Sequence, residues 1–565
     1  MVRAGRRTAL LLAPLTAGAL ILSGCGGGSG SGSGGSAQAH NAGSQQINAR
    51  PVSKLKDGGT LTVAITGWPE QFNFEQVNGL SDDNSRIDQA LLQTPFLGTA
   101  DGGVTMNKNL LESAKLVSKK PQTVDFKINK KAMWSDGTPI TWKDFEAGWK
   151  ANNGKNPAYQ PGGTQGWDAI KSVTRGTDDK DVKIVFSKPY AEWKGLMNFL
   201  YPASQIDTPE KFNKGWINKI PVTAGPFKVK KIDPTAQTLT LERDPNWWGP
   251  KPKLDTVIFR VVDQASQPQA FQSGAIDAID IGTDVATYQT MKGLQNADVR
   301  KALSRDWRVL DFSGKPGTPL ADPNVRLAVM QGIDRKDVGK ATLGPMVPDI
   351  KPLNNHFFVQ GEKGYQDHGT LYSYDPAAAK KALDAAGWKL QAGKKVREKD
   401  GKKLNLTFMI PANTPVSATE MQKIQNQLAK IGVQITPNAV DPNAWGPKFL
   451  TTGNFDLANQ SWIGTPWPIS SSPSIYDFDP KNTQQNFGRI PDTEGIGKLL
   501  AKANGTLDDA ERTHIANQAD KAVSKEGFSL PLYQRPDCWA VKKGLANYGA
   551  FGFADPDWTK VGWTK

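Results

Sequence analysis

The stretch from 223 to 262 constrains the fold most, because it predicts three consecutive strands of one sheet. Apolar and polar residues alternate at 227–232 and 238–242, the pattern of half-buried strands, and a third, mostly apolar run predicts another strand at 257–262. Two prolines flank Trp247 and Trp248 between the second and third runs, and proline lacks the backbone donor that a strand interior needs. A meander with such a bulky aromatic corner needs a larger body to pack against. We therefore expect it in the middle of a domain.

The N-terminal residues predict an export signal that ends at a cysteine. Three arginines within the first seven residues form a positive region, and the apolar stretch 10–22 is too short to span a bilayer comfortably. Small residues then precede Cys25 directly, which resembles the bacterial lipobox, where cleavage precedes a cysteine that receives lipid. We predict a lipoprotein signal peptide over 1–24 and lipidation at Cys25, with fatty acids such as palmitate. An ordinary secretory signal with a chance cysteine is the alternative.

The residues after Cys25 predict a tether. From Gly26 to about Ala49 the chain is a run of Gly, Ser, Gln and Asn with almost no apolar content. We assign the lipidated cysteine and a disordered linker to 25–57, and such a chain would hold the body on the order of 30 Å from the bilayer. Because no second long apolar segment occurs, we expect the lipid alone to anchor the protein to the outer face of the cell membrane.

Charge and cysteine content argue against two classes of protein. The formal net charge is +14, but Lys and Arg are scattered among Asp and Glu without a basic run. Solubility beside an anionic envelope therefore explains the charge better than nucleic-acid binding. If Cys25 carries lipid, Cys538 has no partner, and a chain of 565 residues can bury enough core to need no disulfide. This length favours two or three domains.

The rest of the chain alternates strands and helices, which favours an α/β fold. Apolar runs predict strands at 60–65, 124–128, 182–186, 404–408 and 433–435. Capping residues predict helix starts at Asp82 or Asp83, at Thr141 with Asp144 as its capping-box partner, at Asp322-Pro323 and at Asp375-Pro376. Apolar residues between 421 and 431 share one helix face between the last two strands, which predicts a βαβ unit.

No catalytic or metal-binding constellation is visible. The four histidines stand far apart, and the common nucleophile-elbow, phosphate-loop and zinc-protease motifs do not occur. Acidic pairs such as Asp82-Asp83 and Asp178-Asp179 sit in polar segments, where surface turns explain them better than acid/base chemistry. We therefore predict a protein that is not an enzyme, with no catalytic residues, no metal and no cofactor.

The 17 tryptophans are the most distinctive side chains. Trp462 and Trp467 stand in a stretch with Pro and Gly, after a strand predicted at 455–458. An aromatic side chain in a loop either staples that loop or lines a ligand cleft, and the sequence leaves both readings open. These two tryptophans are the best cleft candidates.

Six segments carry a family pattern: Trp134–Phe145, Ala224–Phe227, Glu242–Gly249, Ser273–Asp277, Asn324–Arg335 and Tyr374–Trp388. In this order they resemble the family 5 extracellular solute-binding proteins of ABC importers, of the oligopeptide- and dipeptide-binding type. Any one segment is weak evidence for this family, whereas six segments in the same order are specific evidence, and together they span most of 58–540. The many tryptophans and the Ala-Gly-Pro-Phe turn are similar to an actinobacterial subgroup, which includes a mycobacterial lipoprotein linked to phosphatidylinositol-mannoside metabolism.

The resemblance implies an α/β fold of the two-lobed periplasmic-binding-protein type 2, with an additional inserted domain. Ligand would be enclosed between the lobes by closure about a hinge. Carried over to this chain, lobe 1 (domain I) comprises 58–84, 185–284 and 535–565, the inserted domain II comprises 85–184, and lobe 2 (domain III) comprises 285–534.

The resemblance also implies where a ligand would lie. Peptide binders of this type often hold an extended ligand by backbone hydrogen bonds, which tolerates many side chains. One strand edge would come from the loop Asn78-Gly79-Leu80. The other would come from Ser461-Trp462-Ile463, followed by Thr465 and Trp467.

One position departs from the pattern. Peptide binders that resemble this chain commonly carry an acidic residue three positions after the tryptophan, which pairs with the α-ammonium of the ligand. Here that position is Thr465, and the next carboxylate in the chain is Asp477. Burying an ammonium without a counter-charge is costly. Either another acid supplies the charge, or the ligand has no free amine there, as in blocked peptides, sugars or glycolipid headgroups.

The main hypothesis is an extracytoplasmic, monomeric, lipid-anchored solute-binding component of an ABC importer. It would take a small-molecule or peptide ligand, deliver it to a permease in the membrane and contact no nucleic acid. The alternative is an envelope lipoprotein of the same fold that regulates, or binds glycolipid or sugar, and does not feed a permease. A third hypothesis, an envelope hydrolase, requires acidic residues in the cleft at glycosidase separation.

Overall fold

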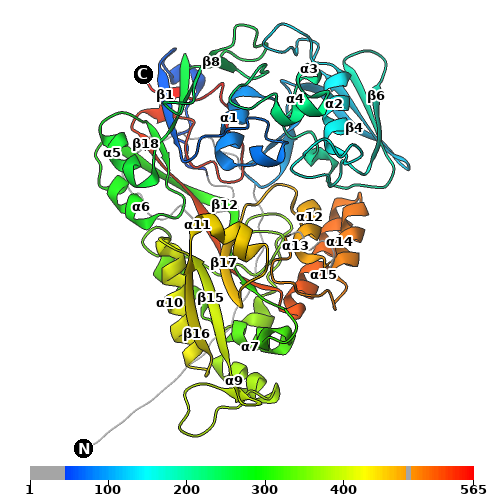
Figure 1. Ribbon diagram of the computed structural model, residues 1–565. Helices are drawn as coiled ribbons and strands as arrows, with labels where there is room; N and C mark the ends of the chain where they lie inside the picture. Colours follow the sequence, from blue (N-terminus) through cyan, green and yellow to red (C-terminus); the bar gives the residue numbers. More distant parts are fainter. Residues whose placement is uncertain (1–44, 479–484) are drawn as a thin grey trace, which may run out of the picture. The chain divides into compact units, whose positions relative to one another are not determined.

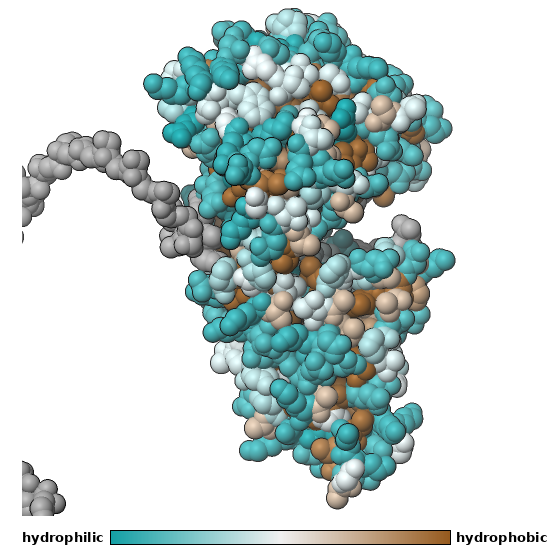
Figure 2. Space-filling model, turned by 90° about the vertical axis from the view of Figure 1, so that its left-hand side faces the viewer, coloured by the Kyte–Doolittle hydropathy of each residue, from teal (hydrophilic) through white to brown (hydrophobic). Residues whose placement is uncertain are grey.

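The computed structural model describes residues 45–478 and 485–565 (Figure 1). The signal peptide predicted for 1–24, the lipidation site Cys25 and the tether as far as residue 44 lie outside the described residues. Within the described ranges, no helix combines the length and the apolar character needed to cross a membrane. Figure 2 shows one face of the molecule, on which hydrophilic residues predominate and hydrophobic residues form small separate groups.

One ten-stranded mixed sheet organises the body. Its strand order is β16-β15-β17-β12-β18-β11-β1-β10-β9-β8. In chain order the strands are β1 (Thr60–Ile65), β8 (Phe227–Asp233), β9 (Thr238–Arg243), β10 (Thr256–Val261), β11 (Ala278–Asp280), β12 (Ala297–Phe312), β15 (Asn405–Pro411), β16 (Gln434–Val440), β17 (Leu457–Trp462) and β18 (Ser529–Lys542). The long strands β12 and β18 pair antiparallel near the middle of the sheet and link its two ends.

The predicted meander forms one end of this sheet. β8, β9 and β10 are antiparallel neighbours, and β1 pairs in parallel with β10. Leu239, Leu241 and Phe259 are fully buried, as their alternation predicts. Together with Leu61 and Phe227 they belong to a hydrophobic cluster that we call the first core.

A separate four-stranded antiparallel sheet contributes to the same core. Its order is β4-β5-β7-β6, with β4 (Leu111–Lys119), β5 (Gln122–Ile128), β6 (Ile170–Arg175) and β7 (Asp181–Phe186). The helix α2 (Trp142–Asn152) begins with the predicted capping box, in which the Thr141 backbone N–H donates to Asp144 at 2.8 Å. Phe126 and Phe145 pack edge to face between the sheet and this helix.

The other end of the large sheet is covered by helices and forms the second core. β15 and β16 are parallel and joined by α10 (Pro415–Ala429), which confirms the predicted βαβ unit. Asp322 and Asp375 cap α7 (Pro323–Gln331) and α9 (Pro376–Ala385), as expected from the Asp-Pro pairs. Leu310, Ile424 and Leu530 are among the fully buried members of this second core.

The remaining helices and three short strand pairs complete the described chain. The remaining α-helices are α1 (Asp82–Leu91), α3 (Ala203–Ile206), α4 (Pro209–Lys214), α5 (Gln267–Gln272), α6 (Val285–Lys292), α8 (Arg335–Leu343), α11 (Pro442–Ala444), α12 (Pro468–Ser471), α13 (Pro473–Tyr476), α14 (Ile496–Gly505) and α15 (Asp509–Glu526). The short strand pairs are β2 (Phe96–Gly98) with β3 (Val104–Met106), β13 (Glu398–Lys399) with β14 (Lys402–Lys403), and β19 (Leu545–Ala546) with β20 (Gly562–Trp563).

Two local expectations are wrong. The linker predicted for 25–57 extends too far, because 45–57 packs against the C-terminal segment: the Gln46 N–H donates to Ala550 O at 3.0 Å, and Leu55 is buried. The cap of α1 is Ser81, whose side chain accepts from the Asn84 N–H. Asp83, one of the two predicted caps, instead accepts hydrogen bonds from the backbone after β1.

Candidate functional site

A pocket of about 550 Å³ is lined by residues of the first core and by the loop 463–467. One wall comes from one side of α1, from the segment 92–98 and from Gly195–Phe199. The opposite wall is the loop 463–467, which follows β17. The segment 555–559, near the C-terminus, closes one side. Segments far apart in the chain therefore meet at one concave site, which is where ligands bind in most proteins.

Aromatic rings supply much of the pocket wall. They belong to Phe74, Phe96, Phe199, Trp247, Trp467 and Trp558. Trp467 lies directly over Gly195, because a Cβ atom built on this glycine would be 2.7 Å from the indole ring. Only glycine allows this approach. Trp558 is 4% exposed, and its Nε1 has no hydrogen-bond partner among the described residues.

The charged side chains that line the pocket are all acidic. They are Asp82, Asp555 and Asp557, and this lining contains no Lys, Arg or His. Asp557 is neutralised by Lys560 at 2.9 Å, and Asp555 accepts a hydrogen bond of 2.6 Å from the Gly98 N–H. Asp82 has neither a hydrogen bond nor an ion pair with the part of the chain that the structure describes.

The end of the pocket near Asp82 has more carboxylates than cations. Desolvation raises the pKa of Asp82, and the Arg86 guanidinium acts in the opposite sense. Arg86 is already paired with Asp280 and lies 3.5 Å from Asp83. The second nearby cation, Arg535, lies 3.7 Å from Asp306. These cations therefore have other carboxylates to balance besides Asp82.

Asp306 brings a carboxylate to the loop that carries Thr465. The register of β12 shifts between Leu303 and Trp307, and this irregularity contains Asp306. Its Oδ1 accepts a hydrogen bond of 3.1 Å from the Gly464 N–H. Residue 465 is not acidic, but Asp306 from another strand thus places a carboxylate beside the same loop.

Three of the residues predicted from the loop after β17 line the pocket, and two do not. Ile463, Thr465 and Trp467 are part of the lining, and the Thr465 hydroxyl accepts from the Trp467 N–H at 3.1 Å. Ser461 and Trp462 are the last residues of β17. Trp462 stacks on Phe487 with ring centroids 5.8 Å apart, so this tryptophan staples the fold locally.

The loop predicted to offer the other strand edge has a different structure. Val77–Gly79 is a single turn of 3₁₀ helix, and the Asn78 N–H donates to the Gln76 side chain at 2.7 Å. Gly79 is buried, and Leu80 is 51% exposed. None of Asn78, Gly79 and Leu80 lines the pocket. This segment is therefore folded into a turn by local hydrogen bonds, whereas pairing with a ligand would need an extended backbone.

Sequence reasoning missed Asp82, Asp306 and Asp555. The Asp82-Asp83 pair was visible but looked like a surface turn. Asp306 lies in an irregular part of a strand, and Asp555 follows the strands that carry the family pattern. Their convergence depends on pairings between distant segments, which a single sequence does not show.

A carboxylate also joins the two cores beside the pocket. Glu192 follows β7 and is 4% exposed. Its Oε2 accepts from the Ser470 N–H at 2.8 Å and its Oε1 from the Ile469 N–H at 3.3 Å, at the start of α12. Burial raises the pKa of Glu192, whereas these hydrogen bonds lower it. Ile469 belongs to the second core, so the contact joins opposite sides of the pocket.

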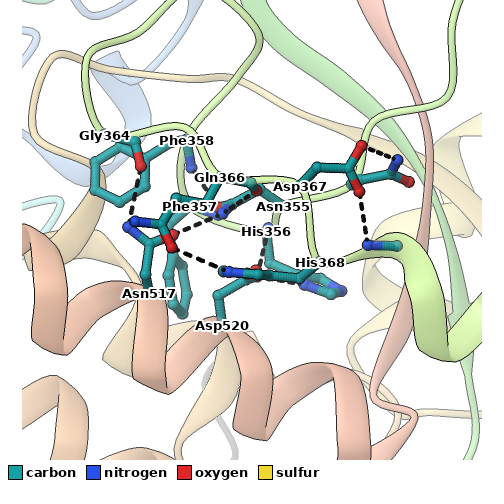
Figure 3. Close-up of polar contacts among 12 residues, drawn as sticks. Asn355, His356, Phe357, Phe358, Gly364, Gln366, Asp367, His368, Asn517 and Asp520 are labelled. Atoms are coloured by element: carbon teal, nitrogen blue, oxygen red, sulfur yellow. Dashed lines mark hydrogen bonds and ion pairs between the residues drawn. The ribbon is translucent and has the colours of Figure 1, made fainter.

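A second polar cluster lies close to the loop 463–467 and has a structural role (Figure 3). The fully buried Asp520 of α15 pairs with His356 Nδ1 at 2.7 Å and with His368 Nδ1. Burial raises the pKa of Asp520, but the two histidine hydrogen bonds hold it below its ordinary value. The adjoining cavity is about 20 Å³, room for roughly one water. No group of side chains in the described ranges is arranged to hold a metal ion.

A family model and the most similar relatives indicate the same protein family. Residues 105–484 match the model of the bacterial extracellular solute-binding proteins, family 5 Middle. The chain is 36% identical over 563 residues to the oligopeptide-binding protein OppA of Mycobacterium tuberculosis, covering 98% of this chain and 93% of OppA. It is also 27% identical over 413 residues to a probable monoacyl phosphatidylinositol tetramannoside-binding protein, LpqW, from the same species, covering 66% of this chain and 63% of LpqW.

Solved structures share the fold. A periplasmic EDTA-binding protein, EppA, superposes with a TM-score of 0.83 at 28% identity, covering 91% of this chain and 98% of EppA. The oligopeptide-binding protein AppA of Bacillus subtilis, solved with a nonapeptide, gives a TM-score of 0.74 at 21% identity, covering 91% of this chain and all of AppA. The expected two-lobed α/β fold of periplasmic-binding-protein type 2 is confirmed by these similarities.

Proposed function

The chain belongs to the bacterial extracellular solute-binding proteins of family 5, and from this premise we propose that it is the receptor of an ABC importer for peptide or peptide-like solutes. A member of this family is a binding protein and not an enzyme. The single observation that carries the proposal is the pocket between the first core and the loop that follows β17. Its volume of about 550 Å³ lies within the ~300–1,000 Å³ that is usual for ligand sites.

The pocket has the chemistry to hold a peptide backbone. Gln89 and Asn198 line it, and their side chains make no hydrogen bond with the described part of the protein, so the side-chain amides are free to pair with ligand amides. The aromatic rings would cover apolar ligand side chains. We propose Ile463, Thr465 and Trp467 as contacts from the second lobe and Asp82 as a contact from the first.

Binding would proceed by closure of two lobes about a hinge. We keep the lobe boundaries expected from the sequence, which cross the chain before β12 and within β18, and place the hinge at these two crossings, next to the long strand pair that links the ends of the sheet. Closing buries the ligand, and affinity arises from contacts made only in the closed state. The Glu192 contact with α12 would be one of them.

Lipidation at Cys25 would hold this monomeric receptor at the outer face of the membrane beside its permease. A Cys25→Ala variant should lose incorporation of labelled palmitate and appear in the medium. Retention of label by the variant would contradict the assignment.

The proposed function is tested by mass spectrometry of ligands that co-purify with the protein, followed by thermal denaturation with short peptides. A peptide at 100 times its dissociation constant stabilises the folded state by about 2.7 kcal/mol, which is a measurable shift. We expect peptides in the eluate and an upward shift. Absence of both would refute the proposal.

The alternative, a regulatory lipoprotein that binds sugar or glycolipid, is favoured by the aromatic walls, which also suit sugar rings. Oligosaccharides in the same denaturation assay distinguish it. A shift with oligosaccharides and none with peptides would favour the alternative.

A further inference from the structure

Segments far apart in the chain form one basic surface where the described body begins. Residues 45–57 run along the C-terminal segment, to which the backbone N–H groups of Arg50 and Lys56 each donate a hydrogen bond of 2.8 Å. The carbonyl of Lys253 accepts a hydrogen bond of 2.7 Å from the Gly58 N–H, which adds a third segment. We call this surface the entry face, and its cations are Arg50, Lys54, Lys56, Lys253 and Lys543.

The cations of the entry face outnumber its carboxylates. None of the five forms an ion pair with a described residue, and all but the partly buried Lys253 are exposed. The neighbouring Asp57 is already paired with Arg243 at 2.9 Å and with Lys251 at 3.1 Å. Asp255 is paired with the same arginine at 2.8 Å. The surface therefore has positive charge that the described chain does not neutralise, and it attracts anions.

An open groove of about 530 Å³ crosses the entry face between Lys56 and Lys543. Its lining also includes three glycines, Asp57 and the partly exposed Trp563. The Trp563 indole N–H donates to Thr60 O at 3.0 Å, which fixes the ring in place. Tryptophan and lysine together suit the boundary between lipid and water, because the ring lies at the level of the headgroups while the ammonium groups contact phosphate.

The position of the entry face favours a membrane as the anionic partner. Cys25, the proposed lipid site, precedes Gln45 by 20 residues, and the Gln45 side chain donates to Phe551 O in the C-terminal segment. A chain of that length rich in Gly and Ser spans on the order of 25 Å. A bilayer anchored at Cys25 is therefore close to this face, and the resulting high effective concentration lets weak contacts form. Each basic residue near an anionic bilayer strengthens association about fivefold.

We propose that the entry face binds the anionic phospholipid headgroups of the membrane and thereby holds one side of the body against the bilayer. The inference uses the anchor proposed at Cys25 to explain where the face lies, and it does not depend on which solute the pocket takes. The sequence conceals this surface, because its cations come from three separate segments and no basic run marks them.

The test uses the mature chain with Cys25→Ala, so that surface charge acts without an attached lipid. Co-sedimentation measures binding to vesicles of equal parts phosphatidylglycerol and phosphatidylcholine, and to vesicles of phosphatidylcholine alone, at low and high salt. The face variant combines Lys54→Gln, Lys56→Gln, Lys253→Gln and Lys543→Gln. The matched control removes the same charge from exposed lysines elsewhere, whose side chains have no partner among the described residues: Lys171→Gln, Lys340→Gln, Lys351→Gln and Lys521→Gln.

We expect binding to the anionic vesicles to be at least about tenfold tighter than to phosphatidylcholine alone, and to weaken at high salt. The face variant should lose at least about tenfold in affinity, while the control should stay within about threefold of the unsubstituted chain. Replacement of the same four lysines by arginine should preserve binding, which separates loss of charge from damage to the fold.

Equal binding to both kinds of vesicle, or equal losses in the face variant and the control, overturns the inference and leaves the proposed pocket and anchor standing. Failure of the proposed anchor shows separately, as a wild-type protein without palmitate label.

Discussion

Replacement of Glu192 by alanine should weaken ligand binding without changing any residue that lines the pocket. The carboxylate accepts two backbone hydrogen bonds, of 2.8 and 3.3 Å, from the start of α12. Hydrogen bonds to charged groups contribute about 1.5–3 kcal/mol each. When the lobes open, Glu192 exchanges these hydrogen bonds for hydrogen bonds to water, and its burial in the closed form costs free energy. We therefore take about 2 kcal/mol as the net contribution of Glu192 to closure.

The expected effect on affinity follows from the closure equilibrium. If the free protein is mainly open, the apparent dissociation constant is inversely proportional to the small fraction of the free protein that is closed. A loss of about 2 kcal/mol then weakens binding about 30-fold. Glu192→Gln should have a smaller effect, because the amide oxygen can keep one hydrogen bond.

Two measurements check this prediction. Calorimetry with the peptides that bind the wild-type protein gives the change in affinity, and small-angle scattering gives the compaction on ligand addition. Glu210→Ala is the matched control, because the side chain of this glutamate is 74% exposed and, among the described residues, pairs only with Lys214 across one helical turn. Affinity within about threefold of wild type, together with unchanged compaction, would show that Glu192 does not stabilise the closed form.

The remaining predictions concern stability and packing. Asp520→Asn should destabilise the second core by about 3–5 kcal/mol, since it breaks a buried pair with two histidines. Because the pKa of Asp520 is lowered in the folded state, the stability advantage of the wild type should be present above the ordinary Asp pKa and should shrink as the pH falls through the folded pKa. Thermal denaturation across acid pH would show this change. Glu420→Gln should cost a similar amount, because it leaves Arg308 buried with a neutral partner; a melting temperature equal to wild type would contradict this. Gly195→Ala should cost about 1–3 kcal/mol and weaken ligand binding, because the new methyl group would clash with Trp467; a crystal structure with an undisturbed indole would argue against it.

Local sequence signals predicted individual elements well. β1 spans the residues predicted for it, and the predicted capping box of Thr141 and Asp144 lies at the start of α2. The βαβ unit around α10 is likewise confirmed. In each case the information lies within a few residues: a period of two, a side-chain oxygen before a helix, or apolar residues three and four apart.

The site was harder to predict because it depends on distant pairings. β12 extends over Ala297–Phe312, and its partner β18 lies more than two hundred residues later. The shift in register that places Asp306 beside Gly464 exists only in that pairing. Trp462 and Trp467 looked equivalent in the sequence, yet one stacks on Phe487 while the other lines the pocket.

The contact between residues 45–57 and the C-terminal segment has a practical consequence. Gln46 bonds to Ala550, and the Lys56 N–H donates to Trp563 O at 2.8 Å, so both ends of the folded body are fastened together. A lipid attached by engineering beyond Lys565 would thus reach the body at nearly the same place as the lipid that we propose at Cys25. A permuted chain, with its old ends joined by a short glycine linker and new ends opened in an exposed turn, should keep the pocket intact.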